Sequence, residues 1–134
     1  MVYASAGSHS CVEKGALLAG FGRENVRMVP LDQAQGMRPD ALSELIERDL
    51  AAGLRPCAVA ACVGGTATAS IDPLREIADI ARRYGLWLHV DAAMAGSAMI
   101  LAECRWMWDG IESADSVVIN AHKWLGAPFD CSLY

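Results

Sequence analysis

At 134 residues, with 54% hydrophobic and 20% charged residues, the chain has the composition of a globular domain and not of a disordered segment. Its net charge of −5, with arginines and lysines scattered along the chain, argues against nucleic acid as a partner, because phosphate binding needs a basic stripe. No apolar run approaches the ~20 residues that span a membrane, and five cysteines without C-x-x-C spacing indicate a reducing, cytoplasmic environment.

The N-terminal part of the chain predicts a strand, a helix and a second strand. Residues 1–4 resemble the inside of a strand, and residues 25–30 form another short one. Between them, residues 12–19 follow a helical pattern. The Ser10-x-x-Glu13 spacing predicts a capping box at the start of that helix.

A second helix and a buried strand follow. Residues 40–52 place apolar side chains on one face at helical spacing and end at a glycine. The acidic residues of this helix are expected on a solvated face; they are Asp40, Glu44, Glu47 and Asp49. Residues 57–63 are apolar without alternation, which is typical of a strand covered on both faces.

The same alternation continues in the second half of the chain. Asp72 and the proline after it predict a helix cap and first turn, and an apolar stripe then runs to about Gly85. Buried strands are expected at residues 86–90 and 116–120, and the stretch 99–112 between them is predicted to be partly helical.

These elements predict the α/β fold class, with a mostly parallel sheet, flanking helices and right-handed crossovers. No repeat, low-complexity tract or linker divides the chain, so residues 1–134 are expected to lie in a single domain. Both ends fall within strand-like sequence, and we expect the chain to be a fragment of a longer protein.

Polar side chains collect where the predicted strands end. In an open parallel sheet, the loops at the carboxyl ends of the strands converge and bind ligands there. The residues at these positions are His9, Thr66, Asp91, Asn120, His122 and Lys123. We therefore expect them to share one pocket.

Asp91 and Lys123 are the pair with the clearest chemical meaning. A lysine that ends a buried strand is expected to be partly desolvated, which lowers its pKa and leaves a nucleophilic amine able to form a Schiff base. A carboxylate in the same pocket can keep a heteroaromatic nitrogen protonated. A lysine Schiff base with such a carboxylate is the arrangement of a pyridoxal phosphate site.

Each of these residues also has a simpler explanation when it is taken alone. A lysine at a strand end is most often a surface charge. Asp91 and Thr66 can serve as ordinary turn residues, and His9 can simply begin a helix. A zinc site built from His9, His89 and His122 is a further alternative, although their spacing fits no known ligand pattern.

Four segments carry a resemblance that favours the cofactor site. They are His9–Lys14 (HSCVEK), Val63–Thr68 (VGGTAT), Leu88–Ala93 (LHVDAA) and Asn120–Trp124 (NAHKW). In order and spacing the chain resembles the group II pyridoxal-phosphate-dependent decarboxylases, the family of aromatic amino acid and glutamate decarboxylases. The resemblance implies a central fragment of the large, cofactor-binding domain of that family, which has the fold of the fold-type I enzymes.

The resemblance also implies a role for each site residue. Lys123 would carry the Schiff base with pyridoxal 5'-phosphate, Asp91 would pair with the pyridine nitrogen, and His9 would stack on the ring. The remaining cofactor contacts implied by the family are Ala93 on the other ring face, Thr66, Asn120, and His122 beside the phosphate and the substrate. No metal is expected. His89 should share the side of the strand on which Asp91 lies.

The implied function is decarboxylation of an L-amino acid, in which carbon dioxide leaves and a proton takes its place. Met94 stands where the animal enzymes of the family usually have tyrosine, and Ala121 replaces the usual proline, which leaves the substrate open. Family members are several times longer and act as homodimers, so the isolated fragment is expected to be inactive. The alternatives are a transaminase, desulfurase or aldehyde-forming lyase with the same cofactor, or a non-catalytic interaction module.

Overall fold

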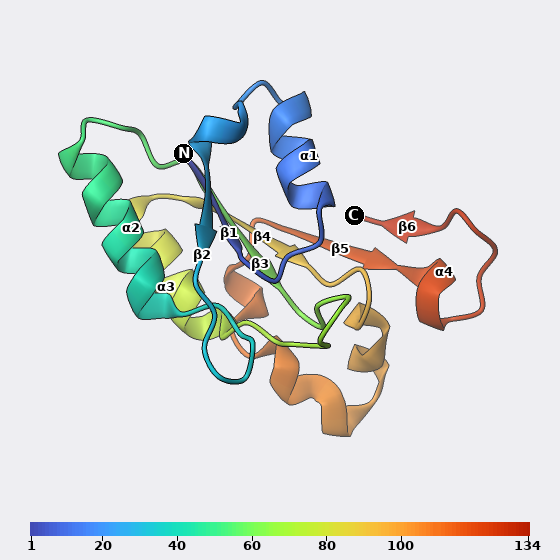
Figure 1. The fold of residues 1–134 in the computed structure, drawn as a ribbon. Helices are drawn as coiled ribbons and strands as arrows, with labels where there is room; N and C mark the ends of the chain where they lie inside the picture. The colour runs from blue at the N-terminus through green and yellow to red at the C-terminus, as the bar shows by residue number, and fades with distance from the viewer.

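The computed structural model describes residues 1–134 and contains one six-stranded sheet in the order β2-β1-β3-β4-β5-β6 (Figure 1). The strands are β1 (Val2–Ser5), β2 (Val26–Val29), β3 (Ala58–Cys62), β4 (Trp87–Asp91), β5 (Ser116–Asn120) and β6 (Ser132–Leu133). The first five are parallel, and β6 pairs antiparallel with β5. The predicted α/β class with a mostly parallel sheet is confirmed.

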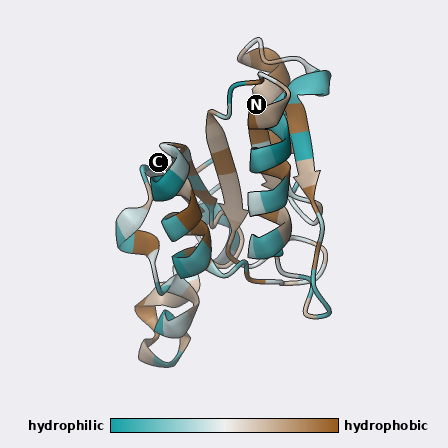
Figure 2. Cartoon of the chain, turned by 90° about the vertical axis from the view of Figure 1, so that its left-hand side faces the viewer, coloured by the Kyte–Doolittle hydropathy of each residue, from teal (hydrophilic) through white to brown (hydrophobic).

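Helices lie on both sides of this sheet. They are α1 (Cys11–Leu18), α2 (Pro39–Ala51), α3 (Leu74–Tyr84) and α4 (Ala121–Trp124). Helices α2 and α3 cover one face, and α1 lies against the other (Figure 1). In Figure 2 much of the outward side of α2 and α3 is hydrophilic, as expected of helices that bury one apolar stripe. None of the helices is long and apolar enough to cross a membrane.

The stretch predicted as partly helical between β4 and β5 contains short 3₁₀ helices and no α-helix. With the one that precedes β2, they are η1 (Arg23–Asn25), η2 (Gly96–Ile100), η3 (Ala102–Trp108) and η4 (Ile111–Ser113). Leu101 and Asp109 have extended backbone angles, and these two positions divide the stretch into separate pieces. A continuous α-helix is therefore prevented.

The hydrophobic core lies between the sheet and helices α2 and α3. Tyr3 pairs with Val59, and Val59 pairs with Leu88, so these neighbouring side chains point to the same side of the sheet. All three are almost completely buried. The helices contribute the side chains that pack against them, among them Leu42, Ile46, Ile77 and Ala78.

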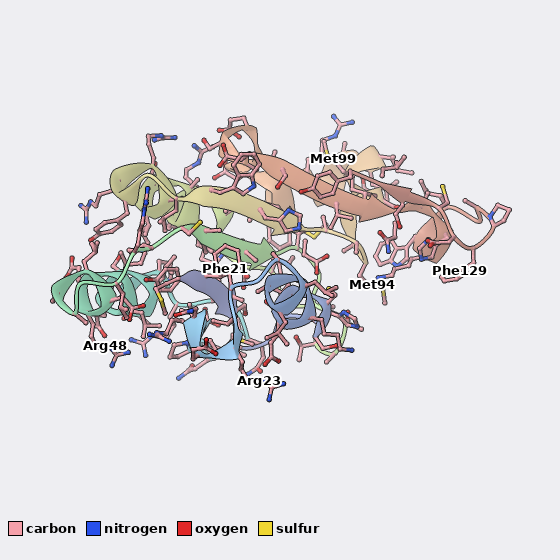
Figure 3. The ribbon with its side chains drawn as sticks, turned by 90° about the horizontal axis from the view of Figure 1, so that it is seen from above. Phe21, Arg23, Arg48, Met94, Met99 and Phe129 are labelled. Atoms are coloured by element: carbon pink, nitrogen blue, oxygen red, sulfur yellow. The ribbon has the colours of Figure 1, made fainter.

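The opposite face of the sheet is more open. Val2, Ala58 and Trp87 form one row across β1, β3 and β4, and Trp87 is 53% exposed. Cys62 and Asp91 are neighbours near the carboxyl ends of their strands. Figure 3 views the molecule from the side of α1, which covers part of this face. A cavity lies between α1 and this face.

The predicted capping box of α1 is wrong. Ser10 makes no hydrogen bond from its side chain to the helix, and Glu13 instead forms a 2.8 Å ion pair with Arg23. Ser10 already has helical backbone angles, whereas a capping side chain is normally aimed by an extended backbone. The N–H of Cys11 is accepted by Nδ1 of His9 instead, at 3.2 Å.

Asp72 does not cap α3, contrary to the prediction. Its carboxylate oxygens accept the backbone N–H groups of Met37 and Cys62, both at 2.7 Å, and the residue is 1% exposed. Pro73 occupies the position before the first residue of α3. Asp72 therefore joins the loop before α2 to the end of β3, where its acceptors satisfy two buried donors.

Asp49 also differs from the prediction, since it is buried and not on a solvated face. It accepts a hydrogen bond of 2.9 Å from the hydroxyl of Tyr3 and one of 3.0 Å from Nη2 of Arg27. Burial and the neighbouring carboxylate raise the pKa of Tyr3. Hydrogen bonds from side chains of β1 and β2 thus compensate for the burial of a carboxylate at this position of α2.

Replacing Asp72 with asparagine is expected to lower the free energy of unfolding by about 1–3 kcal/mol, because an amide can accept only one of the two buried N–H groups. Denaturant unfolding of the complete protein measures the change. Asp40→Asn is the matched control, since Asp40 is exposed and its ion pair with Arg38 is screened by solvent. Equal stability of the two variants would contradict this role for Asp72.

Candidate active site

A cavity of about 670 Å³ opens between α1 and the exposed face of the sheet. This volume is in the range of small-molecule sites. The predicted site residues that line it are His9, Thr66, Asp91, Ala93, Asn120 and Lys123. The sheet brings them together because β3, β4 and β5 are adjacent and parallel, so that their carboxyl ends meet at one edge.

Asp91 is the most enclosed polar residue of the cavity. It ends β4 and is 9% exposed. Its Oδ1 accepts the backbone N–H of Ala93 at 3.1 Å, whereas Oδ2 has only the thiol of Cys11 within reach, at 3.9 Å. A thiol is a weak donor, so this buried oxygen retains most of its capacity to accept. A protonated heteroaromatic nitrogen is the kind of group that such an oxygen fits.

Lys123 lies at the open side of the same cavity. The chain turns into α4 directly after β5, so Lys123 is carried past the sheet edge and is exposed. The expected desolvation of this lysine is therefore wrong for this chain. Its amine takes part in none of the salt bridges of the structure, which leaves it available to a carbonyl compound in the cavity.

His9 faces the cavity from the turn that begins α1. Its Nδ1 accepts the N–H of Cys11, so the neutral imidazole carries its proton on Nε2. This contact fixes one edge of the ring and leaves the ring face free. A flat, exposed imidazole held in this way is suited to stack on another planar ring.

The loops after β3 and β4 pack closely together, and this packing positions the residues that lie between Asp91, Lys123 and His9. Gly64 has a φ of +77°, and a Cβ at this position would lie 2.2 Å from Cβ of Ala95. Only glycine therefore lets the loop after β3, which carries Thr66, approach the loop after β4. The backbone N–H of Asn120 donates to the carbonyl of Ala93 at 3.3 Å, which ties the end of β5 to the same loop.

His122 is the predicted site residue that the structure does not bring to the cavity. Its Nδ1 accepts the backbone N–H of Cys131 at 3.1 Å, and its ring packs edge-on against Phe129, with the ring centroids 4.9 Å apart. The side chain is thereby directed toward the turn that leads into β6. A contact between His122 and a cofactor or substrate stays a prediction.

Two further residues, Cys11 and His89, line the cavity. Cys11 was assigned no role from the sequence, and His89 was expected at most to support Asp91. His89 lies on the same side of β4 as Asp91, as expected, and its Nδ1 is 2.9 Å from Oγ of Ser116. Burial lowers the pKa of His89, although Asp91 acts in the opposite direction. The sequence feature that could have identified Cys11 as a site residue is its position two residues after His9, on the turn that faces the sheet edge.

The five cysteines differ in their burial. Cys11 and Cys57 are exposed, Cys62 is buried, and Cys104 and Cys131 are intermediate. All five are free thiols. The three histidines do not converge either, and no group of three metal-binding side chains is positioned to hold a metal ion.

Comparison with known proteins assigns the family. The pyridoxal-dependent decarboxylase conserved domain matches residues 1–134. Tyrosine decarboxylase 2 of Arabidopsis thaliana is 48% identical over 98% of the chain and 25% of its own length, and phenylacetaldehyde synthase of the same plant is 46% identical over 99% and 28%. The crystal structure of Oryza sativa TDC with PLP superposes with a TM-score of 0.95 at 43% identity, covering 98% of this chain and 28% of that one.

The chain therefore spans about a quarter of the length of these relatives. The matched domain includes all of the cavity residues described above. By sequence, fold and domain match, this chain belongs to the family of pyridoxal-dependent decarboxylases.

Proposed function

We propose that this chain is part of the cofactor-binding large domain of a pyridoxal 5'-phosphate-dependent decarboxylase that acts on an L-amino acid. The observation that carries the proposal is the common cavity of Asp91 and Lys123. One supplies a buried carboxylate oxygen with spare acceptor capacity, and the other supplies a free amine. These are the two groups that the cofactor requires at its ring nitrogen and at its carbonyl carbon.

The other cavity residues support the same assignment. His9 offers a ring face on one side, and Ala93 offers a small side chain on another wall of the cavity. Thr66 and Asn120 add polar groups at the ends of β3 and β5. When bound, pyridoxal phosphate acts as an electron sink for the bond that breaks at the α-carbon of the substrate. In this arrangement Asp91 holds the proton at the ring nitrogen, and Lys123 tethers the cofactor.

Aromatic L-amino acids are the proposed substrates, because the relative most similar in the comparison above is a tyrosine decarboxylase. A second candidate function is formation of an aldehyde from the same substrates. It is favoured by one observation, namely that identity to phenylacetaldehyde synthase, at 46%, nearly equals identity to the tyrosine decarboxylase, at 48%. Overall similarity therefore does not separate the two reactions.

Product analysis of the complete protein tests these functions. The protein is incubated with pyridoxal phosphate and with L-tyrosine, L-tryptophan, L-phenylalanine or L-glutamate, the last as a control without an aromatic ring. We expect carbon dioxide and the corresponding aromatic amine in equal amounts. An aldehyde as the main product would favour the second candidate, and a keto acid would indicate transamination. Failure of the protein to bind the cofactor would contradict both functions and favour a non-catalytic module.

We further propose that the complete protein acts as a homodimer in the cytoplasm. Several large apolar side chains between β4 and β5 are exposed in this chain, as expected of a surface that is covered in an assembly. They are Met99, Ile100, Leu101 and Trp106. The five free thiols support a reducing compartment.

A further inference from the structure

The thiol of Cys11 contacts the carboxylate that defines the candidate site. Cys11 is the first residue of α1, and its Sγ lies 3.9 Å from Oδ2 of Asp91, within the range of a hydrogen bond to sulfur. The residue is exposed and lines the cavity together with Lys123. The thiol therefore borders the space between the two groups assigned to the cofactor.

The position of this thiol is fixed by the first turn of α1. The backbone N–H of Cys11 is held by Nδ1 of His9, and the N–H of Lys14 bonds to the carbonyl of Ser10 at 3.0 Å. His9 and Cys11 thus belong to one hydrogen-bonded turn. This turn is set 80 residues away from Asp91 in the sequence, so the contact depends on the tertiary fold and not on local chain geometry.

Electrostatics keep the Cys11 thiol protonated. Partial burial and the charge of Asp91 raise its pKa, while Lys123 acts in the opposite direction. Cys62, the neighbour of Asp91 on β3, is buried, and its pKa is raised to about 12. Both thiols are consequently neutral near pH 7, and Cys11 is the one that can donate to Oδ2 from the cavity side.

We propose that Cys11 is a positioning residue for Asp91. The thiol of Cys11 holds Oδ2 of Asp91 in place, and this thiol is covered when pyridoxal phosphate binds. The inference rests on the proposed function. The N–H of Ala93 holds one carboxylate oxygen, and the Cys11 thiol holds the other, so the two contacts together fix the plane of the carboxylate. Because a thiol is a weak donor, it orients Oδ2 without consuming the capacity that a protonated ring nitrogen needs.

Site-resolved alkylation tests whether the cofactor covers this thiol. The complete protein is treated with iodoacetamide with and without pyridoxal phosphate, and the modified cysteines are quantified by mass spectrometry. Cys57 is the internal control, because it is exposed at the other end of the sheet and does not line this cavity. We expect the cofactor to slow alkylation of Cys11 by about tenfold or more, as for a group covered by a ligand, and to leave Cys57 unchanged.

Two outcomes of this experiment are distinguishable. If the cofactor absorbance appears and Cys11 is alkylated at the same rate in both states, the positioning inference is wrong and the proposed function stands. If no cofactor binds, the proposed function is wrong and the inference falls with it.

Substitution of Cys11 tests the contact with Asp91 itself. Cys11→Ala is expected to weaken cofactor binding about three- to tenfold, the effect of losing one hydrogen bond, and to alter the pH dependence of the cofactor absorbance. Cys11→Ser, which retains a donor, should restore most of both properties, and Cys57→Ala should match the parent protein. Parent-like binding and pH dependence in Cys11→Ala would overturn the inference.

Discussion

Replacing Lys123 with alanine in the complete protein is expected to abolish the visible absorbance of the bound cofactor and to lower decarboxylation at least about 10³-fold. The cavity contains no other lysine, so no second primary amine can replace the one that is lost. Exposure of Lys123 at the cavity mouth predicts that the substitution leaves the fold intact. Absorbance spectra with added cofactor and release of labelled carbon dioxide measure the two effects.

The chain offers a matched control for this experiment. Lys14 is the other lysine of the sequence, and it is exposed on α1 without lining the cavity. Lys14→Ala removes the same charge and should retain both the absorbance and the activity. A cofactor spectrum that survives in Lys123→Ala and disappears in Lys14→Ala would reverse the assignment of the attachment site.

The sheet could be predicted from the sequence because its strands are marked by apolar runs that carry little local ambiguity. The run over residues 57–63 contains β3, and the observed bounds of β4 and β5 lie within a residue of the predicted ranges 86–90 and 116–120. The rule that ligands bind beyond the carboxyl ends of parallel strands then predicted a shared pocket for six polar residues, and five of them line the cavity, the exception being His122. This step required only an approximate strand order, and the alternation of predicted strands and helices was enough to provide it.

The buried carboxylates could not be predicted in the same way. Asp49 and Asp72 have sequence neighbours typical of a solvated helix face and of a helix cap, respectively. Their partners, such as Tyr3 for Asp49 and Met37 for Asp72, come from distant segments. A local pattern identifies a carboxylate but not the donors that the fold brings to it, and those donors determine whether it is buried.

The directions of the side chains within the site could not be predicted from the sequence either. His122 and Lys123 are adjacent, yet the first turn of α4 directs one to Cys131 and the other to the cavity. Cys11 had no recognisable partner, because Asp91 reaches it only through the packing of α1 on the sheet. Motifs therefore located the site, whereas the contacts that orient its groups depend on the tertiary structure.

Asp91→Asn is expected to retain the fold and the cofactor but to lower the decarboxylation rate about 10²–10³-fold, the usual cost of removing one preorganised electrostatic group. The amide oxygen can still accept the N–H of Ala93, so the loop after β4 keeps its anchor. The amide nitrogen then replaces Oδ2, and a donor faces the ring nitrogen in place of an acceptor. The nitrogen can no longer be held protonated, and the ring becomes a poorer electron sink.

The rate at saturating substrate, together with the cofactor dissociation constant, separates this effect from simple loss of binding. Asp72→Asn is the matched comparison, because it changes a carboxylate to an amide beside the end of the neighbouring strand β3, where Asp72 accepts the N–H of Cys62 and does not itself line the cavity. It should lower stability while leaving the rate near that of the parent protein below the unfolding transition. A rate for Asp91→Asn within about threefold of the parent would mean that the charge at the ring nitrogen contributes less than ~1 kcal/mol to the transition state. The pairing of Asp91 with the cofactor would then be positional and not electronic.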